Sequence, residues 1–224
     1  RWTVLRLKVL CATIAGKLAE AERLANEAVT LGMESGQPDA LILHAMQLGS
    51  IHILRGRTEL VASLMPPVEQ VIDRPDLRAA YAGACIFTGR LDEARDLLAR
   101  AAATSFADIA DDFMWLFQMT SWATVCDAVD AEKEAGIVYS LLAPWHDRIE
   151  YNGTTSQGAV ALYLGMLAAL LGRHDAAEAG REPRERARSL RDDARTIASA
   201  HGFAGLLCEL DAESAAAPQS RRKA

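Results

Sequence analysis

The sequence predicts an all-α fold, a right-handed α-solenoid of about five helix-turn-helix units. One observation is a repeat, in which a turn residue followed five positions later by a small or β-branched apolar residue recurs every 33 to 42 residues. Repetition at this period is typical of stacked arrays, because one unit cannot bury its apolar face alone. A second is composition, since only 6% of the residues are aromatic whereas Ala and Leu are abundant, which favours close-packed helices. Finally, no run of alternating β-branched residues bounded by turn dipeptides indicates a strand.

Each of the five units is marked by the residue expected at the turn between its two helices. These turn residues are Gly16, Gly56, Gly89, Asp130 and Gly172. Glycine suits this position because it adopts positive φ, which other residues resist. The helix pairs expected around the turns are 2–15 with 18–34, 39–55 with 58–72, 76–88 with 91–103, and 109–129 with 131–145, and a fifth pair begins with 158–171.

The expected domain organisation is an array over residues 1–180, followed by two segments of different character. Residues 181–213 are expected to form atypical C-terminal capping helices, because the last unit of an array must present a polar face to water. Residues 214–224 contain Ala, Ser, Pro and Arg without periodicity and are expected to be disordered. The polar stretch 146–157 is the longest expected loop within the array. The chain begins with Arg1 and not with Met, which we interpret as a piece of a longer protein.

Composition and charge argue against several classes of partner. The net charge of −6 argues against direct binding of nucleic acid, which requires a clustered basic face. The longest apolar stretch, 159–171, is too short for a membrane span of about 20 residues. The four cysteines form no C-x-x-C pair, and no secretory segment is visible. We therefore expect them to be reduced and mostly buried, in a cytoplasmic protein.

The spacing of small residues around the turns resembles the tetratricopeptide repeat. In that repeat a Leu-Gly pair in the first helix precedes the turn glycine by seven positions, as Leu48-Gly49 and Leu164-Gly165 do here. The consensus Trp and Tyr are mostly missing and the units are longer than the standard 34 residues, so the resemblance is to a divergent variant. The residues that would define the repeat structurally are Gly16, Gly49, Gly56, Gly89, Ala94, Asp130, Ala135, Gly165, Gly172 and Ala177.

A narrower resemblance is carried by Trp115-Leu116, Cys126, the run 139–144 and the run 163–175. These residues are similar to the helical-repeat region of bacterial signalling ATPases, namely LuxR-type, maltose-regulator-like transcriptional regulators and cyclase-associated regulators. The resemblance implies a regulatory or scaffolding role. It does not carry over ATPase or DNA-binding activity, because this chain has no phosphate-binding loop and no DNA-binding helix-turn-helix signal.

Candidate binding residues come from the first helix of each unit, because in tetratricopeptide arrays these helices line the concave groove. Adaptable Met and rigid aromatic side chains suit such a groove. The alternative for each residue is that it fills the seam between units. The candidate groove residues are Met46, Phe87, Phe117, Thr120, Thr124, Asp127 and Met166.

The sequence offers little catalytic chemistry. His44 and His52 alone among the five histidines can share a helix face, and no carboxylate or cysteine completes a metal site with them. Asp111-Asp112 is expected to cap a helix. No nucleophile elbow, phosphate loop or dinucleotide fingerprint occurs, so we expect no cofactor and no catalysis.

These observations favour a non-catalytic regulatory module that binds a protein partner or another domain of its parent chain. The alternative is a sensor domain that binds a small apolar effector in its groove. A hydrolase or transferase is the least favoured hypothesis, because it needs a nucleophile–base pair that the sequence does not show.

Overall fold

The computed structural model describes residues 1–64, 77–156, 158–174, 192–197 and 199–200, and over these ranges the fold is all-α. The α-helices of the N-terminal part are α1 (Trp2–Ile14), α2 (Leu18–Glu34) and α3 (Ala40–Leu54), followed by the 3-10 helix η1 (Thr58–Leu64). The C-terminal part contains α5 (Arg78–Phe87), α6 (Leu91–Ala102), α7 (Trp115–Ala128), α8 (Glu132–Leu142), the 3-10 helix η3 (Ala143–Trp145) and α9 (Val160–His174). Within the described ranges, β pairing is limited to an isolated bridge between Ile149 and Ala159.

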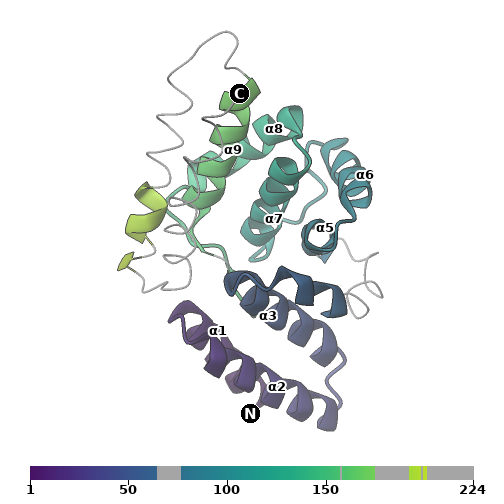
Figure 1. Cartoon of the computed structure of the whole chain (residues 1–224), viewed down its shortest axis with the longest axis vertical. Coiled ribbons are helices and arrows are strands. Elements are labelled where there is room, and N and C mark those ends of the chain that lie inside the picture. Colours follow the sequence, from purple (N-terminus) through teal and green to yellow (C-terminus); the bar gives the residue numbers. More distant parts are fainter. Residues whose placement is uncertain (65–76, 157, 175–191, 198, 201–224) are drawn as a thin grey trace, which may run out of the picture.

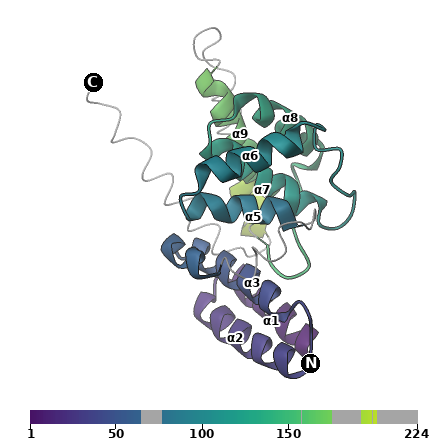
Figure 2. The same cartoon turned by 90° about the vertical axis from the view of Figure 1, so that its right-hand side faces the viewer.

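The helices pack in sequence order, each against its neighbours along the chain. α1 packs on α2 and α2 on α3, and η1 lies between α3 and α5. α5, α6 and α7 pack together, and α7, α8 and α9 continue the arrangement toward the other end of the molecule (Figures 1 and 2). This succession of antiparallel pairs agrees with the predicted all-α class.

The core is divided between the two parts of the chain. One cluster of buried apolar side chains joins α1, α2 and α3, and a larger one joins α5 to α9. Both contain alanines with no exposed surface, among them Ala21, Ala94 and Ala135, which let the helices approach closely where they cross. A small third cluster, Ile42, Leu77, Met114 and Phe117, connects the two parts.

The turn conformation predicted from the repeat is present at four of the five marked positions. Gly16, Gly56 and Gly89 have φ of 70°, 68° and 75°, and Asp130 has φ of 56°. In each case the preceding helix ends two residues earlier, so the left-handed residue reverses the chain between paired helices. Gly172 differs, because it lies inside α9, which continues to His174.

Two predicted helices are shorter in the structure. The helix expected over 109–129 begins only at Trp115, and its N-cap residue, Met114, leaves it without the side-chain cap expected from Asp111-Asp112. Asp112 instead accepts a hydrogen bond at 2.8 Å from the backbone N–H of Met114, which forms a local turn before the helix. Residues 58–64 of the helix expected over 58–72 form a 3-10 helix, and the remainder lies outside the described residues.

Other predictions fall wholly or partly outside the described residues. Of the expected capping helices, residues 192–197 and 199–200 are helical, whereas the rest of 181–213 and the whole of 214–224 are not described. Ala177 and Cys208 also lie outside. Cys85 and Cys126 are buried as expected, and burial raises the pKa of the Cys126 thiol to about 12. Cys11 is exposed, contrary to the expectation for most of the cysteines.

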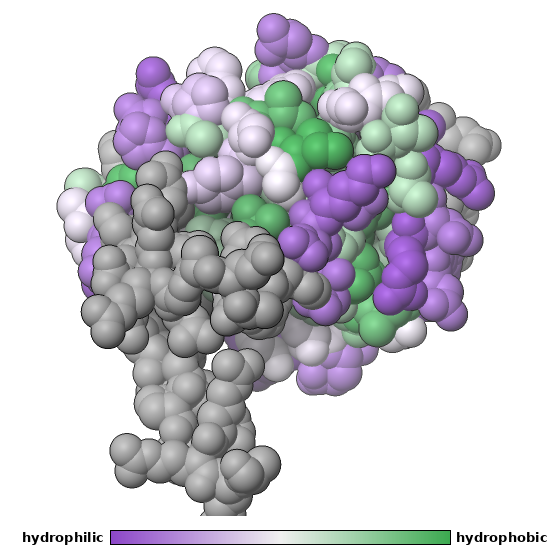
Figure 3. Space-filling model, turned by 90° about the horizontal axis from the view of Figure 1, so that it is seen from above, coloured by the Kyte–Doolittle hydropathy of each residue, from purple (hydrophilic) through white to green (hydrophobic). Residues whose placement is uncertain are grey.

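The surface at the end of the molecule that carries α8 and α9 is mixed in character. Seen from that end, apolar residues form small patches between hydrophilic ones over the part of the face that described residues make (Figure 3). None of the described helices combines the length and the apolar character needed to cross a lipid bilayer.

Gly32 of α2 provides a test of the packing at the first helix pair. A Cβ there would lie 2.6 Å from Nε1 of Trp2 and 2.8 Å from Cβ of Ala40. We expect Gly32→Ala to lower the free energy of unfolding by about 1–3 kcal/mol, measured by urea denaturation, because the added methyl overpacks this contact. The matched control Gly136→Ala on α8 places its Cβ within 4 Å of no neighbour. It should instead be stabilising, by about 0.5–1 kcal/mol. Equal stabilisation by both variants would contradict the described contact.

Candidate functional site

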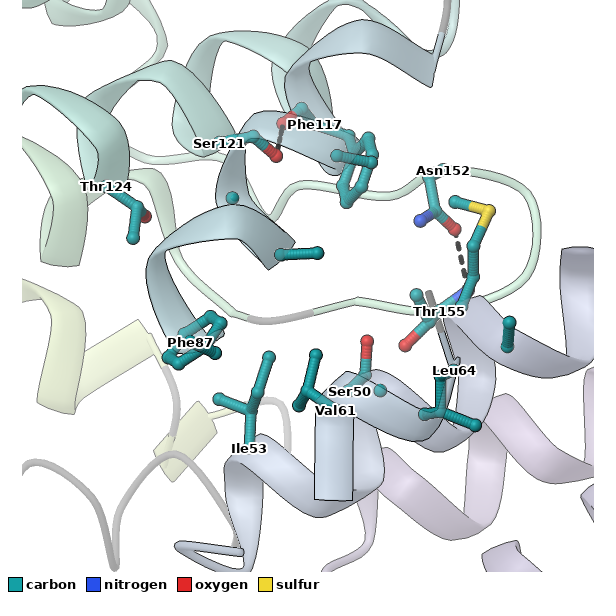
Figure 4. Close-up of a pocket in the computed structure, with 16 residues that line it drawn as sticks. Ser50, Ile53, Val61, Leu64, Phe87, Phe117, Ser121, Thr124, Asn152 and Thr155 are labelled. Carbon is teal, nitrogen blue, oxygen red and sulfur yellow. Dashed lines mark hydrogen bonds between the residues drawn. The ribbon is translucent and has the colours of Figure 1, made fainter. Parts of the chain in front are cut away.

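A cavity of about 100 Å³ lies at the boundary between the two core clusters. Its walls come from α3, η1, α5 and α7, and from the loop of residues 146–159 that precedes α9 (Figure 4). The 3-10 helix separates α3 from α5, which otherwise make few contacts with each other. The cavity therefore occupies a place where the close stacking of the helix pairs is interrupted.

Small residues on the two flanking helices leave room for the cavity. On α3 the wall contains Ala45 and Gly49, and on α5 it contains Ala80, Gly83 and Ala84. These positions recur at intervals of three and four residues, so on each helix they form one stripe along the face toward the cavity. Along these stripes the helices present backbone and methyl groups to the cavity.

Larger apolar side chains also line the cavity. Phe87 at the end of α5 and Phe117 on α7 line the cavity, together with Val61 and Leu64 of η1 (Figure 4). The hydroxyls of the α7 residues Ser121 and Thr124 do not offer free donors. They donate to the carbonyl oxygens of Phe117 and Thr120, at 2.8 and 3.2 Å.

The polar atoms of the site come mainly from the loop. Asn152 and Thr155 line the cavity, and Ser50 of α3 lies opposite them (Figure 4). Oδ1 of Asn152 accepts hydrogen bonds from the backbone N–H groups of Thr154 and Thr155, at 3.0 and 2.7 Å. This side-chain turn holds the loop in a fixed conformation at the edge of the cavity.

The same loop is hydrogen-bonded to α1 and α3. The guanidinium of Arg6 on α1 donates to the carbonyl oxygen of Gly153 at 3.2 Å and to Oγ1 of Thr154 at 3.4 Å. Gln47 of α3, only 2% exposed, donates through Nε2 to the carbonyl oxygens of Arg6 and Thr154, both at 3.3 Å. The loop therefore crosses from the C-terminal part to α1 and α3, as the chain trace shows (Figure 1).

The structure brings together four of the seven residues that the sequence indicated as groove candidates. Met46, Phe87, Phe117 and Thr124 all line the cavity, although they come from three different helices. The other three do not line it. Thr120 is buried and donates its hydroxyl to carbonyl oxygens within α7, Asp127 is half-buried, and Met166 packs against the C-terminal core.

Several residues of the site were not indicated by the sequence. Asn152 and Thr155 lie in a loop whose Asn-Gly pair marks a turn but says nothing about what the turn contacts. Ser50 and Gly83 lie within helices, and neither belongs to a sequence motif that would indicate a binding site. The interval from Ala45 to Gly49 on α3 and the stripe on α5 were the available signals, because both place small residues on one helix face.

The described lining residues carry no ionisable side chain, so the cavity walls offer no general acid or base. The two histidines considered in the sequence lie elsewhere. His44 contacts Oδ1 of Asn26 through Nε2 at 3.0 Å, and partial burial lowers the pKa of its imidazole. Among the residues that the structure describes, no three His, Cys, Asp or Glu side chains gather where they would bind a metal ion.

Comparison of the chain with protein-family models, with curated proteins and with solved structures finds no match. Any function must therefore be inferred from the chain's own residues.

Gln47 tests the attachment of the loop. We expect Gln47→Leu to lower the free energy of unfolding by about 1–3 kcal/mol, because it removes the Nε2 donor from the buried carbonyl oxygen of Thr154 and a second hydrogen bond to the carbonyl oxygen of Arg6. Hydrogen exchange at the amides of Thr154 and Thr155 should accelerate, which mass spectrometry or NMR would detect. Gln37→Leu, at an exposed position between α2 and α3, is the matched control and should leave both measurements near those of the wild type. Unchanged exchange in Gln47→Leu would show that Gln47 does not hold the loop.

Proposed function

We propose that this chain is a non-catalytic, tetratricopeptide-like regulatory module that binds a small, largely apolar effector in the cavity between α3, α5 and α7. The observation that carries the proposal is the cavity itself, with small-residue walls, two phenylalanines and no ionisable side chain among its described lining residues. Ligand sites of this kind combine apolar walls with a few polar groups that fix orientation.

The position of the loop favours a small ligand over an extended peptide. Asn152 and Thr155 form part of the cavity wall, and the loop is held by Arg6 and Gln47. A peptide lying along the first helices would have to displace these contacts, whereas a small molecule would fit beside them. The resemblance to bacterial signalling ATPases supports a role in which effector binding is reported to a partner or to another domain.

A hydrophobic probe tests the proposal. Methylenecyclohexane should raise the Tm of the wild-type chain in a saturable manner, because a ligand that binds only the folded state stabilises it, by about 2.7 kcal/mol at a hundredfold excess over Kd. Gly83→Leu should abolish this shift, because its side chain would fill the cavity where an added Cβ meets no atom within 4 Å.

The control for this experiment is Gly136→Leu. Gly136 also lies inside a helix with no atom within 4 Å of an added Cβ, but it is outside the cavity. This variant should therefore retain the shift. Far-UV circular dichroism checks that both variants remain helical. No saturable shift in the wild type, or an equal shift in both variants, would reject binding in this cavity.

A second candidate function is association with another protein through α1. Its outward face carries Val4 and Leu7, which are 54% and 45% exposed, and the exposed Cys11 follows one turn later. Apolar residues thus occur on both faces of α1, as in helices that are covered on both sides. A protein partner, another domain of a parent chain or a second copy would cover this face by the same contacts.

Self-association of the purified chain tests whether the exposed face of α1 can form a protein–protein contact. We expect sedimentation equilibrium to show concentration-dependent dimers that Leu7→Asp shifts toward monomer, because a charge at the centre of the contact would be buried without a partner. Leu91→Asp, at a residue 39% exposed on α6, should leave the equilibrium unchanged. A wild-type chain that stays monomeric at high concentration would count against pairing through this face.

A further inference from the structure

We propose that the cavity selects an uncharged ligand that carries a hydrogen-bond acceptor, such as the carbonyl oxygen of a small ketone, ester or amide, and that Nδ2 of Asn152 is the donor that binds it. This inference rests on the proposed function and specifies the chemistry of the ligand.

The orientation of the Asn152 amide follows from its hydrogen bonds. Two backbone N–H groups, those of Thr154 and Thr155, point to one atom of the amide at 3.0 and 2.7 Å. Only the oxygen can accept from both, so Nδ2 must lie on the other side. Figure 4 shows the nitrogen on the side toward Phe117, away from the hydrogen bond to the loop backbone.

The amide nitrogen is buried and has no acceptor. Asn152 is only 5% exposed, and its Nδ2 has no hydrogen-bond partner in the structure. Buried donors are nearly always paired, because leaving one unpaired costs the full desolvation penalty of the group. Asn152 lines the cavity, so a ligand acceptor that reaches this nitrogen gains a hydrogen bond there.

Two hydroxyls extend this polar side of the cavity. Ser50 and Thr155 are each 3% exposed and line the cavity, and their oxygens point into the space between α3 and the loop (Figure 4). A hydroxyl donates and accepts, so these groups can contact the same ligand acceptor or a second polar atom near it. These hydroxyls add polar groups to the part of the cavity that lies between α3 and the loop.

Because the described lining residues are uncharged, we expect the ligand to be neutral. The described part of the cavity wall provides no cation for a carboxylate or phosphate and no anion for an ammonium group. A charged ligand would lose its hydration without a compensating partner, which is costly. The volume of about 100 Å³ sets the size. For comparison, an apolar cavity of about 150 Å³ in another protein holds a benzene molecule, so one small ring or a short branched chain suits this one.

Three probes of similar size test the chemistry on the full chain. Cyclohexanone and methylenecyclohexane have the same shape, but only the ketone carries an acceptor, and cyclopentanecarboxylate adds a negative charge. We expect cyclohexanone to bind about 3- to 10-fold more tightly than methylenecyclohexane, the factor that one net hydrogen bond contributes. The side-chain amide resonance of Asn152 should shift with the ketone only, and the carboxylate should bind more weakly than either neutral probe.

Asn152→Asp is the matched variant, because a carboxylate keeps the acceptor for the backbone of Thr154 and Thr155 but removes the donor. It should abolish the preference for the ketone, whereas Asn26→Asp, at an exposed residue of α2, should retain it. The probe comparison in the wild type needs no variant, so it remains decisive if Asn152→Asp does not fold. Equal binding of the two neutral probes, or tightest binding of the carboxylate, would overturn this inference while leaving the proposed function intact. Failure of both neutral probes to bind would reject the proposed function as well.

Discussion

The structure depends on the fact that a single pair of these helices cannot bury its own apolar residues. Alanines without exposed surface, such as Ala21 in α2 and Ala135 in α8, allow helices to cross at short range, and each pair then covers the next. Where this succession is complete, the interior is closely packed. Between α3 and α5 it is incomplete, because the 3-10 helix η1 stands between them and small residues face each other, so a cavity remains.

The local features of the fold followed from the sequence because they are determined by residues close together in the chain. A residue in the left-handed region is required where two helices reverse direction, and Gly16, Gly56 and Gly89 supply it. The bounds of α2 agree with those expected from the turn residue Gly16 and from its helical periodicity. The start of α7 was misplaced, since apolar periodicity cannot reveal that the Asp112 side chain competes with the helix for the backbone.

The candidate site was only partly predictable, and the division has a physical reason. Met46, Phe87 and Phe117 were indicated because each lies on a helix that precedes a predicted turn, and three such helices, α3, α5 and α7, line the cavity. The same argument misplaced Met166, which packs against the C-terminal core. Asn152 and Thr155 line the cavity because of the path that their loop takes between the helices. Helical periodicity does not predict that path. The hydrogen bond that fixes the position of the loop joins Gln47 to Thr154, which are 107 positions apart in the sequence. Neither residue belongs to a sequence pattern that would indicate this contact.

The attachment of the loop to α1 also has a consequence for the order in which the molecule forms. Contacts between helices of one pair are local and can form early, whereas the bond between Arg6 and Thr154 closes a segment of 148 positions. Closing so long a segment costs chain entropy and slows the formation of structures that require it. During synthesis the first helices would therefore be present well before the cavity wall, with the Gln47 amide still hydrated. Completion of the cavity wall would be a late step of maturation, after most of the helical framework already exists.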